Sequence, residues 1–315
     1  MNNLIIGLGQ DATILALKLL KMKDSFKLLV RRSANSSKMI DKYNELRPHV
    51  IYSQEIDFSA LLSIHQEYEI NYIYNFAANS FVQDSYLNFG TYINENYRIV
   101  TEILKFLKTD PRVSLFHPLS SEILDPSDLS RFQPRNAYGV SKLTEYYSCK
   151  VFSEYTNSPI TTCVMFNHES NLRTNHFFTK KILNGIIEGR NKTLEIYNTQ
   201  SKRDWGYAPE FIDIILKSKK QNCTGLTYLG TGTSYSVENF IDMAFTEIGV
   251  DYEKKIINDK LKWDSSNVTI NEISRDAKDS KRILLANRLS VEQTMGSVPT
   301  IYGQKLVQKL INDYV

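Results

Sequence analysis

A tyrosine and a lysine four residues apart, Tyr138 and Lys142, lie at the start of an amphipathic segment at residues 138–155. Positions four apart share one face of a helix, so the ammonium can lie near the phenol. A nearby cation favours the phenolate and lowers the pKa of the tyrosine. Tyr138 can then act as a base for a substrate hydroxyl while a hydride leaves the same carbon. Because the chain has 19 tyrosines, this pair gains its weight from the strand-like segment that precedes it.

That preceding segment, residues 113–119, leads into the run Ser120-Ser121-Glu122. Rossmann sheets bind ligands at the carboxyl ends of their strands, where Ser120 can hydrogen-bond a reacting oxygen. Glu122 adds a carboxylate, which a simple alcohol dehydrogenase does not need. Beside a sugar, it can remove a proton next to a carbonyl and, once protonated, help a hydroxyl leave as water. The plain alternative for Glu122 is a surface acid after a strand.

A glycine turn joins the first predicted strand, residues 4–9, to the first predicted helix, residues 12–22. Small residues there let the backbone approach a pyrophosphate, and the helix start offers free N–H groups and a positive dipole end. The position at the first strand-to-helix junction strengthens a motif that also occurs by chance; a plain glycine turn is the alternative. The predicted contacts are Gly7, Gly9, Gln10 and Asp11, followed by Ala12.

Two arginines, Arg31 and Arg32, close the second predicted strand at residues 27–32. An acidic residue there would bind a ribose 2′-hydroxyl and select NAD, whereas a basic one suits the 2′-phosphate of NADP. A solvated arginine pair is the alternative. Further predicted cofactor contacts lie at the ends of neighbouring elements: Asp57, Phe58, Ala77, Ala78 and Ser80.

Short apolar runs alternate with longer amphipathic segments, which is typical of a parallel sheet covered on both faces. The sequence predicts an α/β fold: a Rossmann-type, doubly wound parallel sheet with a smaller, discontinuous C-terminal lobe. The expected dinucleotide-binding domain covers residues 1–166, with residues 205–231 returning to it, and the expected lobe covers residues 167–204 and 232–315. Further strands are expected at residues 72–78, 161–167, 194–198 and 226–230, and helices at 60–68, 92–107, 209–217, 237–248 and 302–314; residues 254–280 are expected to be charged and irregular.

The charge balance is nearly even, with 38 basic and 35 acidic side chains and a net charge of +3. This argues against nucleic acid or an anionic membrane as a partner. The three cysteines, Cys149, Cys163 and Cys223, are widely spaced and include no CxxC pair, so neither a disulfide framework nor a metal site is expected. The N-terminus has no signal-peptide pattern and no apolar run is long enough to span a membrane. We therefore expect a cytoplasmic protein.

Several segments resemble, in the right order along nearly the whole chain, the extended short-chain dehydrogenase/reductase superfamily and, within it, the GDP-mannose 4,6-dehydratase family. FNHES at residues 166–170 and RDWGYA at residues 203–208 are the most specific. The other similar segments are GQD at 9–11, VRRS at 30–33, YNFAANSFV at 74–82, SSE at 120–122, PRNAYGVSK at 134–142 and GTGTSYSVENFIDMAFTEIG at 230–249. The resemblance implies a 4,6-dehydratase that uses NADP, recycles it internally and converts a GDP-hexose to its 4-keto-6-deoxy derivative.

The resemblance also assigns roles to individual residues. Tyr138 would be the base at C4 with Lys142 as its partner, Glu122 the base at C5, and Ser120 the replacement for a catalytic threonine. His168 and Arg173 would lie along the cofactor, although a structural role is the alternative for His168 alone. The implied substrate contacts are Ser80 and Ser121, with Asn167, Lys181 and Arg203 facing the nucleotide diphosphate.

Departures from the family pattern cluster near the expected sugar site. Leu124 and Asp125 replace Tyr-Gly, and the other changes are Phe81 for histidine, Leu172 for arginine, Tyr197 for glycine and Ala12 for the last glycine of a loop that is one residue shorter. GDP-mannose and a GDP-manno-heptose relative therefore both remain candidate substrates. The alternative functions are a GDP-sugar C4 epimerase or C4 oxidoreductase on the same scaffold, and a non-catalytic dinucleotide-binding regulator.

The resemblance further suggests a homodimer or homotetramer. In such an assembly a loop at Arg32–Ser37 could reach the cofactor of a neighbouring subunit.

Overall fold

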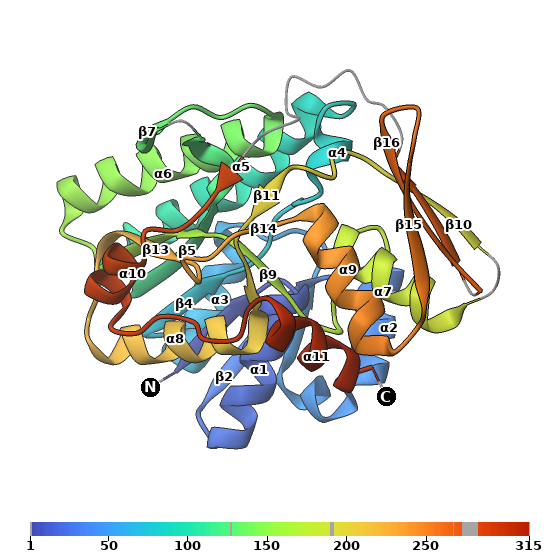
Figure 1. Cartoon of the computed structure of the whole chain (residues 1–315). Coiled ribbons are helices and arrows are strands. Elements are labelled where there is room, and N and C mark those ends of the chain that lie inside the picture. Colours follow the sequence, from blue (N-terminus) through green and yellow to red (C-terminus); the bar gives the residue numbers. More distant parts are fainter. Residues whose placement is uncertain (1, 127, 190–191, 267, 273–282, 315) are drawn as a thin grey trace. The chain divides into compact units, whose positions relative to one another are not determined.

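The computed structural model describes residues 2–126, 128–189, 192–266, 268–272 and 283–314. It divides into two compact units (Figure 1). Unit 1 comprises Met1–Met165 and Ile215–Tyr228, and unit 2 comprises Phe166–Ile214 and Leu229–Val315. The segment predicted to return to the first domain, residues 205–231, extends beyond the observed returning stretch at both ends.

Unit 1 is built around a seven-stranded sheet in the order β13-β8-β5-β4-β1-β2-β3, and each neighbouring pair from β3 to β8 is parallel. The order runs outward in both directions from β1, which is the arrangement of a Rossmann sheet and confirms the predicted fold class. The strands are β1 (Asn3–Ile6), β2 (Phe26–Arg31), β3 (Val50–Ser53), β4 (Tyr72–Asn75), β5 (Ser114–Ser120), β8 (Ile160–Met165) and β13 (Gly225–Leu229).

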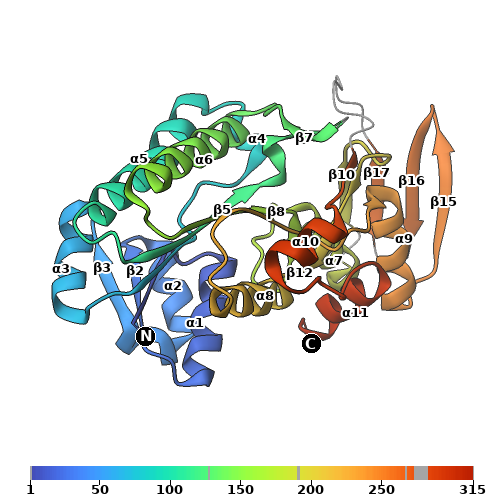
Figure 2. The ribbon, with the colours of Figure 1, turned by 90° about the vertical axis from the view of Figure 1, so that its left-hand side faces the viewer.

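Helices cover both faces of this sheet, with α5 and α6 side by side on one face and α1 on the other (Figure 2). The apolar side chains on the α5 face form one core cluster that includes Leu4, Ile73, Ile103 and Phe106, each at most 1% exposed. Each such aliphatic side chain contributes roughly 1.5–3 kcal/mol by leaving water. The helices of unit 1 are α1 (Gln10–Met22), α2 (Ala34–Lys42), η1 (Asn44–His49), α3 (Phe58–Tyr68), α4 (Val82–Ser85), α5 (Phe89–Leu107), η2 (Ser121–Ile123) and α6 (Ala137–Thr156), and a small hairpin joins β6 (Leu124–Asp125) to β7 (Asp128–Phe132).

Unit 2 has its own apolar core, in which Trp263, Phe240 and Phe245 are at most 1% exposed. A four-stranded sheet in the order β10-β17-β16-β15 packs there with α7, α9 and α11. The elements of unit 2 are β9 (Asn167–Glu169), α7 (Phe178–Glu188), β10 (Lys192–Ile196), β11 (Lys202–Arg203), β12 (Trp205–Tyr207), β14 (Tyr235–Ser236), α9 (Val237–Ile248), β15 (Tyr252–Ile257), β16 (Lys260–Ser265), β17 (Val268–Glu272), β18 (Ile283–Leu284), α10 (Arg288–Met295) and α11 (Gln304–Asn312); helix α8 (Ala208–Lys220) runs from unit 2 into unit 1.

The expectation of an irregular segment at residues 254–280 is wrong for its first part, because most of β15 and all of β16 and β17 lie there; residues 267 and 273–282 fall outside the described residues. Asn258 and Asp259, both with positive φ of 52° and 59°, form the two-residue turn of a hairpin. The charged residues that hide this pattern lie on β15, the outermost strand of its sheet. An edge strand tolerates charge, since one of its sides is unpaired.

The predicted loop at Arg32–Ser37 is also wrong, because helix α2 begins at Ala34. Ser33 and Ser36 form a reciprocal capping box, with the Ser33 hydroxyl accepting from the Ser36 amide at 3.1 Å. Ser33 and Ser36 are therefore the start signal of a helix. Strand β3 and helix α10 were not predicted either, whereas α9 has the predicted bounds.

Candidate active site

Tyr138 and Lys142 both lie on helix α6 and face the same way, as the four-residue spacing predicts. Asn136 begins this helix, and its side-chain oxygen accepts from the amide of Gly139 at 2.8 Å. The cap fixes Tyr138 in the first turn and Lys142 one turn later. The Lys142 ammonium lies 6.0 Å from the centre of the Tyr138 ring, so the structure brings the two predicted groups together.

Ser120 and Glu122 lie where β5 ends and the short helix η2 begins, at the carboxyl edge of the sheet. The Ser120 hydroxyl accepts from the amide of Glu122 at 3.2 Å and so starts η2. The Glu122 carboxylate accepts from the side-chain amide of Asn136 at 2.9 Å. Asn136 therefore holds the predicted acid with its nitrogen and caps the helix of Tyr138 with its oxygen. Sequence analysis placed Asn136 in the motif but gave it no role.

A buried ion-pair network surrounds Lys142, whose side chain is 3% exposed. The Glu145 carboxylate oxygen Oε2 lies 2.8 Å from the lysine Nζ and 2.7 Å from His117 Nε2 on β5. Sequence analysis missed Glu145 and His117. Two signals could have revealed them. His117 is a histidine inside the apolar run of β5, and Glu145 is an acid one turn after Lys142, on the face of α6 that packs against the sheet.

Opposing effects set the protonation of these three groups. Burial lowers the pKa of Lys142, but the Glu145 charge more than offsets it and leaves that pKa raised. Burial raises the pKa of Glu145, but Lys142 and His117 more than offset it and leave that pKa lowered. Burial lowers the pKa of His117, and Glu145 only partly opposes it. At neutral pH the network is therefore an ammonium, a carboxylate and a neutral imidazole.

The glycine turn has the geometry of a dinucleotide-binding loop. Gly7 has φ of +104°, and a side-chain carbon there would lie 3.0 Å from the backbone nitrogen of Ala77. A side chain is therefore excluded where the loop after β1 passes the loop after β4. Gly9 caps the 13-residue helix α1 without a side-chain hydrogen bond, and a side-chain carbon there would contact nothing within 4 Å. The helix start thus has no side-chain cap and no side chain at Gly9 to block a phosphate, so the residues present fit a dinucleotide.

The other predicted cofactor contacts in this turn and after β2 have protein partners of their own. The side-chain amide of Gln10 donates to the Asp11 carboxylate at 3.2 Å. Arg31 lies 3.3 Å from the Glu95 carboxylate in a half-exposed pair, and the Arg32 guanidinium lies over the Tyr52 ring at 4.9 Å.

Asp57 and Phe58 have structural roles at the start of α3. The Asp57 carboxylate caps this helix by accepting from the amide of Ala60 at 2.9 Å. Phe58 packs against the core of unit 1.

Two asparagines hold the loop that contains Ala77, Ala78 and Ser80. The amide of Ala77 donates to the Asn75 side chain at 3.3 Å, and the amide of Asn79 donates to the Asn96 side chain at 2.8 Å. Asn96 also donates to the Ser141 hydroxyl at 3.1 Å, which links the loop to α6. Sequence analysis missed Asn96, although a polar residue on the buried face of an amphipathic helix was a usable signal. Ala78 and Ser80 are exposed.

In unit 2, the two most specific sequence segments pair as neighbouring parallel strands. Strand β9 pairs with β12 so that Asn167 is opposite Trp205 and His168 is opposite Gly206. His168 Nδ1 lies 2.7 Å from the Phe166 carbonyl, and its ring stacks on Phe211.

The basic residues predicted for unit 2 contact groups of their own unit. Arg173 Nε lies 3.3 Å from the Glu169 carboxylate, and Lys181 Nζ donates to the Glu195 carbonyl at 2.8 Å. Arg203 ends β11, two residues before the strand that pairs with Asn167. Pairing thus brings Asn167 and His168 beside the strand that follows Arg203, and Lys181 lies on α7.

Asp204, next to Arg203, is a further residue that sequence analysis did not single out. Its fully buried carboxylate accepts from the backbone amides of Thr231, Gly232 and Ala286 and from the Thr231 hydroxyl, at 2.7–3.1 Å. Burial raises the pKa of Asp204, and these four bonds oppose the rise. Asp204 thereby fixes the backbone that carries Arg203.

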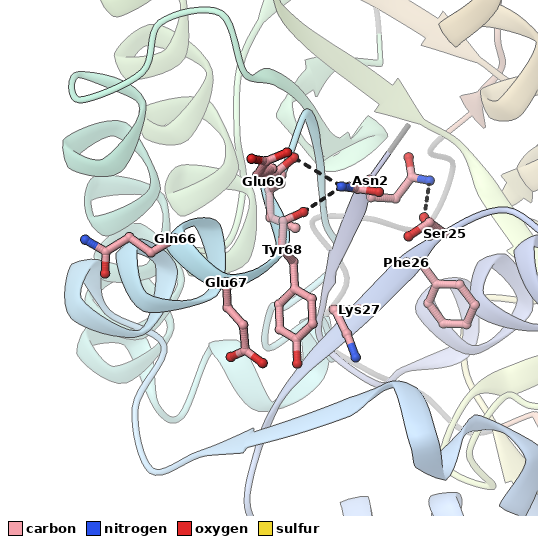
Figure 3. A pocket seen from close by; sticks show the side chains of 10 residues that line it. Asn2, Ser25, Phe26, Lys27, Gln66, Glu67, Tyr68 and Glu69 are labelled. Carbon is pink, nitrogen blue, oxygen red and sulfur yellow. Dashed lines mark hydrogen bonds between the residues drawn. The ribbon is translucent and has the colours of Figure 1, made fainter.

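A polar pocket of about 300 Å³ lies at the other end of the strands (Figure 3). It lies at the amino ends of β1 and β2 and at the end of α3, where the Asn2 side chain donates to the Tyr68 carbonyl at 2.6 Å. None of the predicted site residues lines it. Since Rossmann sheets bind ligands at the carboxyl ends of their strands, this pocket is not the candidate active site.

Comparison with known proteins assigns the chain to one family. The family model described as GDP-mannose 4,6 dehydratase matches residues 4–310. GDP-mannose 4,6 dehydratase 2 from Caenorhabditis elegans is 25% identical, with 98% of this chain and 87% of that protein aligned. GDP-mannose 4,6-dehydratase from Sinorhizobium fredii is 30% identical, with 78% of this chain and 75% of that protein aligned.

Solved structures show the same fold at low sequence identity. A dTDP-glucose 4,6-dehydratase from Bacillus anthracis, in complex with NAD, is 14% identical with a TM-score of 0.79, covering 100% of this chain and 96% of that one. A UDP-glucose 4-epimerase from Thermotoga maritima is 13% identical with a TM-score of 0.81, covering 100% and 98%. Because dehydratases and epimerases share the fold, function must come from the side chains. Within the described residues, every helix is too short or too polar to span a bilayer.

Proposed function

Since the chain belongs to the GDP-mannose 4,6-dehydratase family, we propose that it removes water from a GDP-hexose and forms the 4-keto-6-deoxy sugar nucleotide. The support is a phenol–ammonium couple on α6 and a carboxylate at the end of β5, joined through one asparagine. A C4 epimerase or oxidoreductase would need the couple but not the carboxylate. The Glu122–Asn136 bond is therefore the observation that favours dehydration.

NADP is the proposed cofactor. The open start of α1 at Gly9 suits its pyrophosphate, and Arg32 beside the capped start of α2 suits its 2′-phosphate. Gly7 lies against the backbone of Ala77, where a side chain would not fit. The loops after β1 and β4 can therefore lie close together beside the dinucleotide. When bound, this cofactor supplies an acceptor for hydride and returns the hydride within the same turnover.

Tyr138 and Lys142 carry the first proposed step. The tyrosine oxygen removes the proton from the C4 hydroxyl of the sugar as that carbon is oxidised. The Lys142 ammonium stabilises the phenolate that accepts this proton. Ser120, at the end of β5, hydrogen-bonds the same sugar oxygen and keeps it in line with the phenol.

Glu122 carries the step that separates a dehydratase from an epimerase. A ketone at C4 acidifies the proton on C5, and the Glu122 carboxylate removes it. The protonated acid then gives its proton to the C6 hydroxyl, which leaves as water. Return of the hydride to C6 and of one proton to C5, matching the proton that Tyr138 removed from the C4 hydroxyl, would complete the step, so the product differs from the substrate by one water.

The GDP part is proposed to bind to unit 2. Asn167, Lys181 and Arg203 offer an amide, an ammonium and a guanidinium, which suit a diphosphate through charge-assisted hydrogen bonds. His168 and Arg173 are proposed to lie along the cofactor, and Ser80 and Ser121 along the sugar. GDP-mannose and a GDP-manno-heptose are the first substrates to try. A homodimer or homotetramer working in the cytoplasm, where free thiols stay reduced, completes the proposal.

The test is incubation of the purified protein with NADP and a panel of GDP-sugars, followed by mass spectrometry. Loss of one water from a GDP-hexose or GDP-heptose, without net consumption of NADP, is the expected result. An isomer of unchanged mass identifies an epimerase, and stoichiometric NADPH identifies an oxidoreductase. If NADP binds but no sugar gives a product, the result favours the alternative of a non-catalytic, dinucleotide-binding regulator.

A further inference from the structure

A continuous row of hydrogen-bonded, buried side chains runs from Asn75, at the end of β4, to Lys142. The Asn75 side-chain nitrogen lies 3.2 Å from His117 Nδ1, His117 Nε2 lies 2.7 Å from Glu145, and Glu145 lies 2.8 Å from Lys142. All four side chains lie in unit 1, and none of the four residues is more than 2% exposed. The mechanism above uses only the last of them.

The direction of each hydrogen bond in this row of side chains follows from the orientation of the Asn75 amide. The Asn75 oxygen accepts from the backbone amide of Ala77, so its nitrogen must be the atom that faces His117. An amide nitrogen only donates, which makes His117 Nδ1 an acceptor and places the ring proton on Nε2. That proton is then donated to Glu145. The imidazole is therefore neutral and leaves the full negative charge on Glu145.

Glu145 uses a single oxygen, Oε2, for both Lys142 and His117, while its other oxygen is buried and has no hydrogen-bond partner. Such a carboxylate is costly to bury, and its nearest compensation is the ammonium of Lys142. The same ammonium is expected to stabilise the phenolate of Tyr138. The Lys142 ammonium thus serves two anions: the permanent carboxylate of Glu145 and the Tyr138 phenolate, which forms during the reaction.

We infer that Glu145 is a positioning residue that fixes the Lys142 ammonium beside Tyr138 and, through its charge, raises the pH at which Tyr138 becomes a base. The inference rests on the proposed role of Tyr138. The Glu145 charge, 2.8 Å from the Lys142 ammonium, favours the protonated form of Lys142 directly, and it offsets the positive charge by which Lys142 lowers the pKa of Tyr138. Removing it should therefore make Tyr138 and Lys142 lose their protons at lower pH.

Among the described residues, other titratable groups face this pair from β5, α5, α6 and η2. His117 faces it from β5 and is neutral, and Tyr92 on α5 interacts with Tyr138. Burial raises the pKa of Cys149, which lies one turn after Glu145 on α6, to a value that keeps its thiol protonated. Glu122 on η2 is held by Asn136. The negative charge that directly contacts Lys142 is thus that of Glu145.

The test is Glu145→Gln, which keeps the shape and places an amide oxygen where Oε2 accepts both hydrogen bonds. The protein is labelled with ¹³C at the tyrosine Cζ, and its NMR titration is followed, with the Tyr138 signal assigned by its absence in Tyr138→Phe. We expect the titration midpoint of Tyr138 to fall by about one pH unit, the low end of the roughly 1–3 units caused by a charge in close contact, because Glu145 contacts Lys142 and acts on Tyr138 from behind it. A midpoint that is unchanged or higher overturns the inference.

Two matched variants separate the charge from the substitution. Glu145→Asp retains the charge and should leave the Tyr138 midpoint near that of the unmodified chain. Glu154→Gln makes the same chemical change on an exposed part of the same helix, and it should not move the midpoint. A midpoint that falls in either variant as far as in Glu145→Gln contradicts an effect of the Glu145 charge.

The unmodified chain gives a second test, which does not depend on the folding of any variant. Nitrogen-15 NMR of its histidines should show His117 neutral, with the proton on Nε2, throughout the pH range in which Tyr138 titrates. A charged His117, or a proton on Nδ1, would overturn the proposed arrangement. All these signals are read without substrate, so they stand even if the panel of GDP-sugars gives no dehydration.

Discussion

Gly139 lies directly against the backbone of Glu122. A side-chain carbon at Gly139 would be 2.7 Å from the Glu122 carbonyl oxygen, closer than such atoms come in proteins. The first turn of α6, which carries Tyr138, and the short helix η2, which carries Glu122, therefore approach each other by backbone contact. The glycine between Tyr138 and Lys142 sets the spacing of the two proposed bases.

Gly139→Ala should separate η2 from α6. Overpacking of this kind typically costs about 1–3 kcal/mol of stability, and the displaced Glu122 should reduce dehydration more than it reduces NADP binding. Thermal unfolding, the dehydration rate and NADP affinity measure these effects. Gly90→Ala is the matched control, since a side-chain carbon there meets nothing within 4 Å. Equal stability and activity in both variants would contradict the role of this contact.

Glu122→Gln should remove the proposed base at C5 but leave the fold and the couple on α6 in place. We expect the dehydration rate to fall by roughly 10²–10⁴-fold, which is the usual range for general acid–base catalysis. NADP affinity should stay the same, because the change lies on the substrate side of the proposed mechanism. Exchange of the C5 proton with deuterium from the solvent should fall with it. Dehydration at a near-normal rate would mean that another group removes this proton.

Arg32→Ala should weaken NADP binding and spare NAD. The guanidinium lies over Tyr52 and is exposed at the end of β2, where only NADP carries a 2′-phosphate to meet it. Losing one charge-assisted contact corresponds to about 1.5–3 kcal/mol, or roughly a 10- to 150-fold rise in the Kd for NADP. Calorimetry with both cofactors measures the ratio. Arg112→Ala, an exposed arginine paired with Asp110, is the control, and an equal loss for NAD and NADP would reject 2′-phosphate recognition.

Asp204→Asn should destabilise the chain through unit 2. The Asp204 carboxylate accepts four hydrogen bonds, two at each oxygen, and in either orientation an amide nitrogen would face at least one backbone N–H that it cannot satisfy. We expect a loss of about 3 kcal/mol in unfolding free energy, measured by denaturant titration. Asp251→Asn, at an exposed position of the same unit, should unfold at the same denaturant concentration as the parent chain.

Sequence patterns predicted the parts of the site that depend on local spacing. The interval between Tyr138 and Lys142 puts both on one helix face, and the glycines after β1 indicate a loop that must approach another backbone. The hairpin of β15 and β16 was missed, since charges on an edge strand mask its alternation. The Asn-Asp pair at residues 258–259, which forms the turn, was the sequence feature that could have indicated this hairpin.

The sequence by itself determined the Rossmann-type alternation of strands and helices, the family and the chemical types at the proposed site, because hydrophobic period and motif spacing are local properties of the chain. Only the tertiary structure decided that Asn136 holds Glu122, that Asn96 holds the loop after β4, and that Glu145 and His117 enclose Lys142. These contacts join segments that are 14 to 28 residues apart, except for that between Glu145 and Lys142. They form only when the packed sheet and helices remove water from polar groups that must then find partners within the protein.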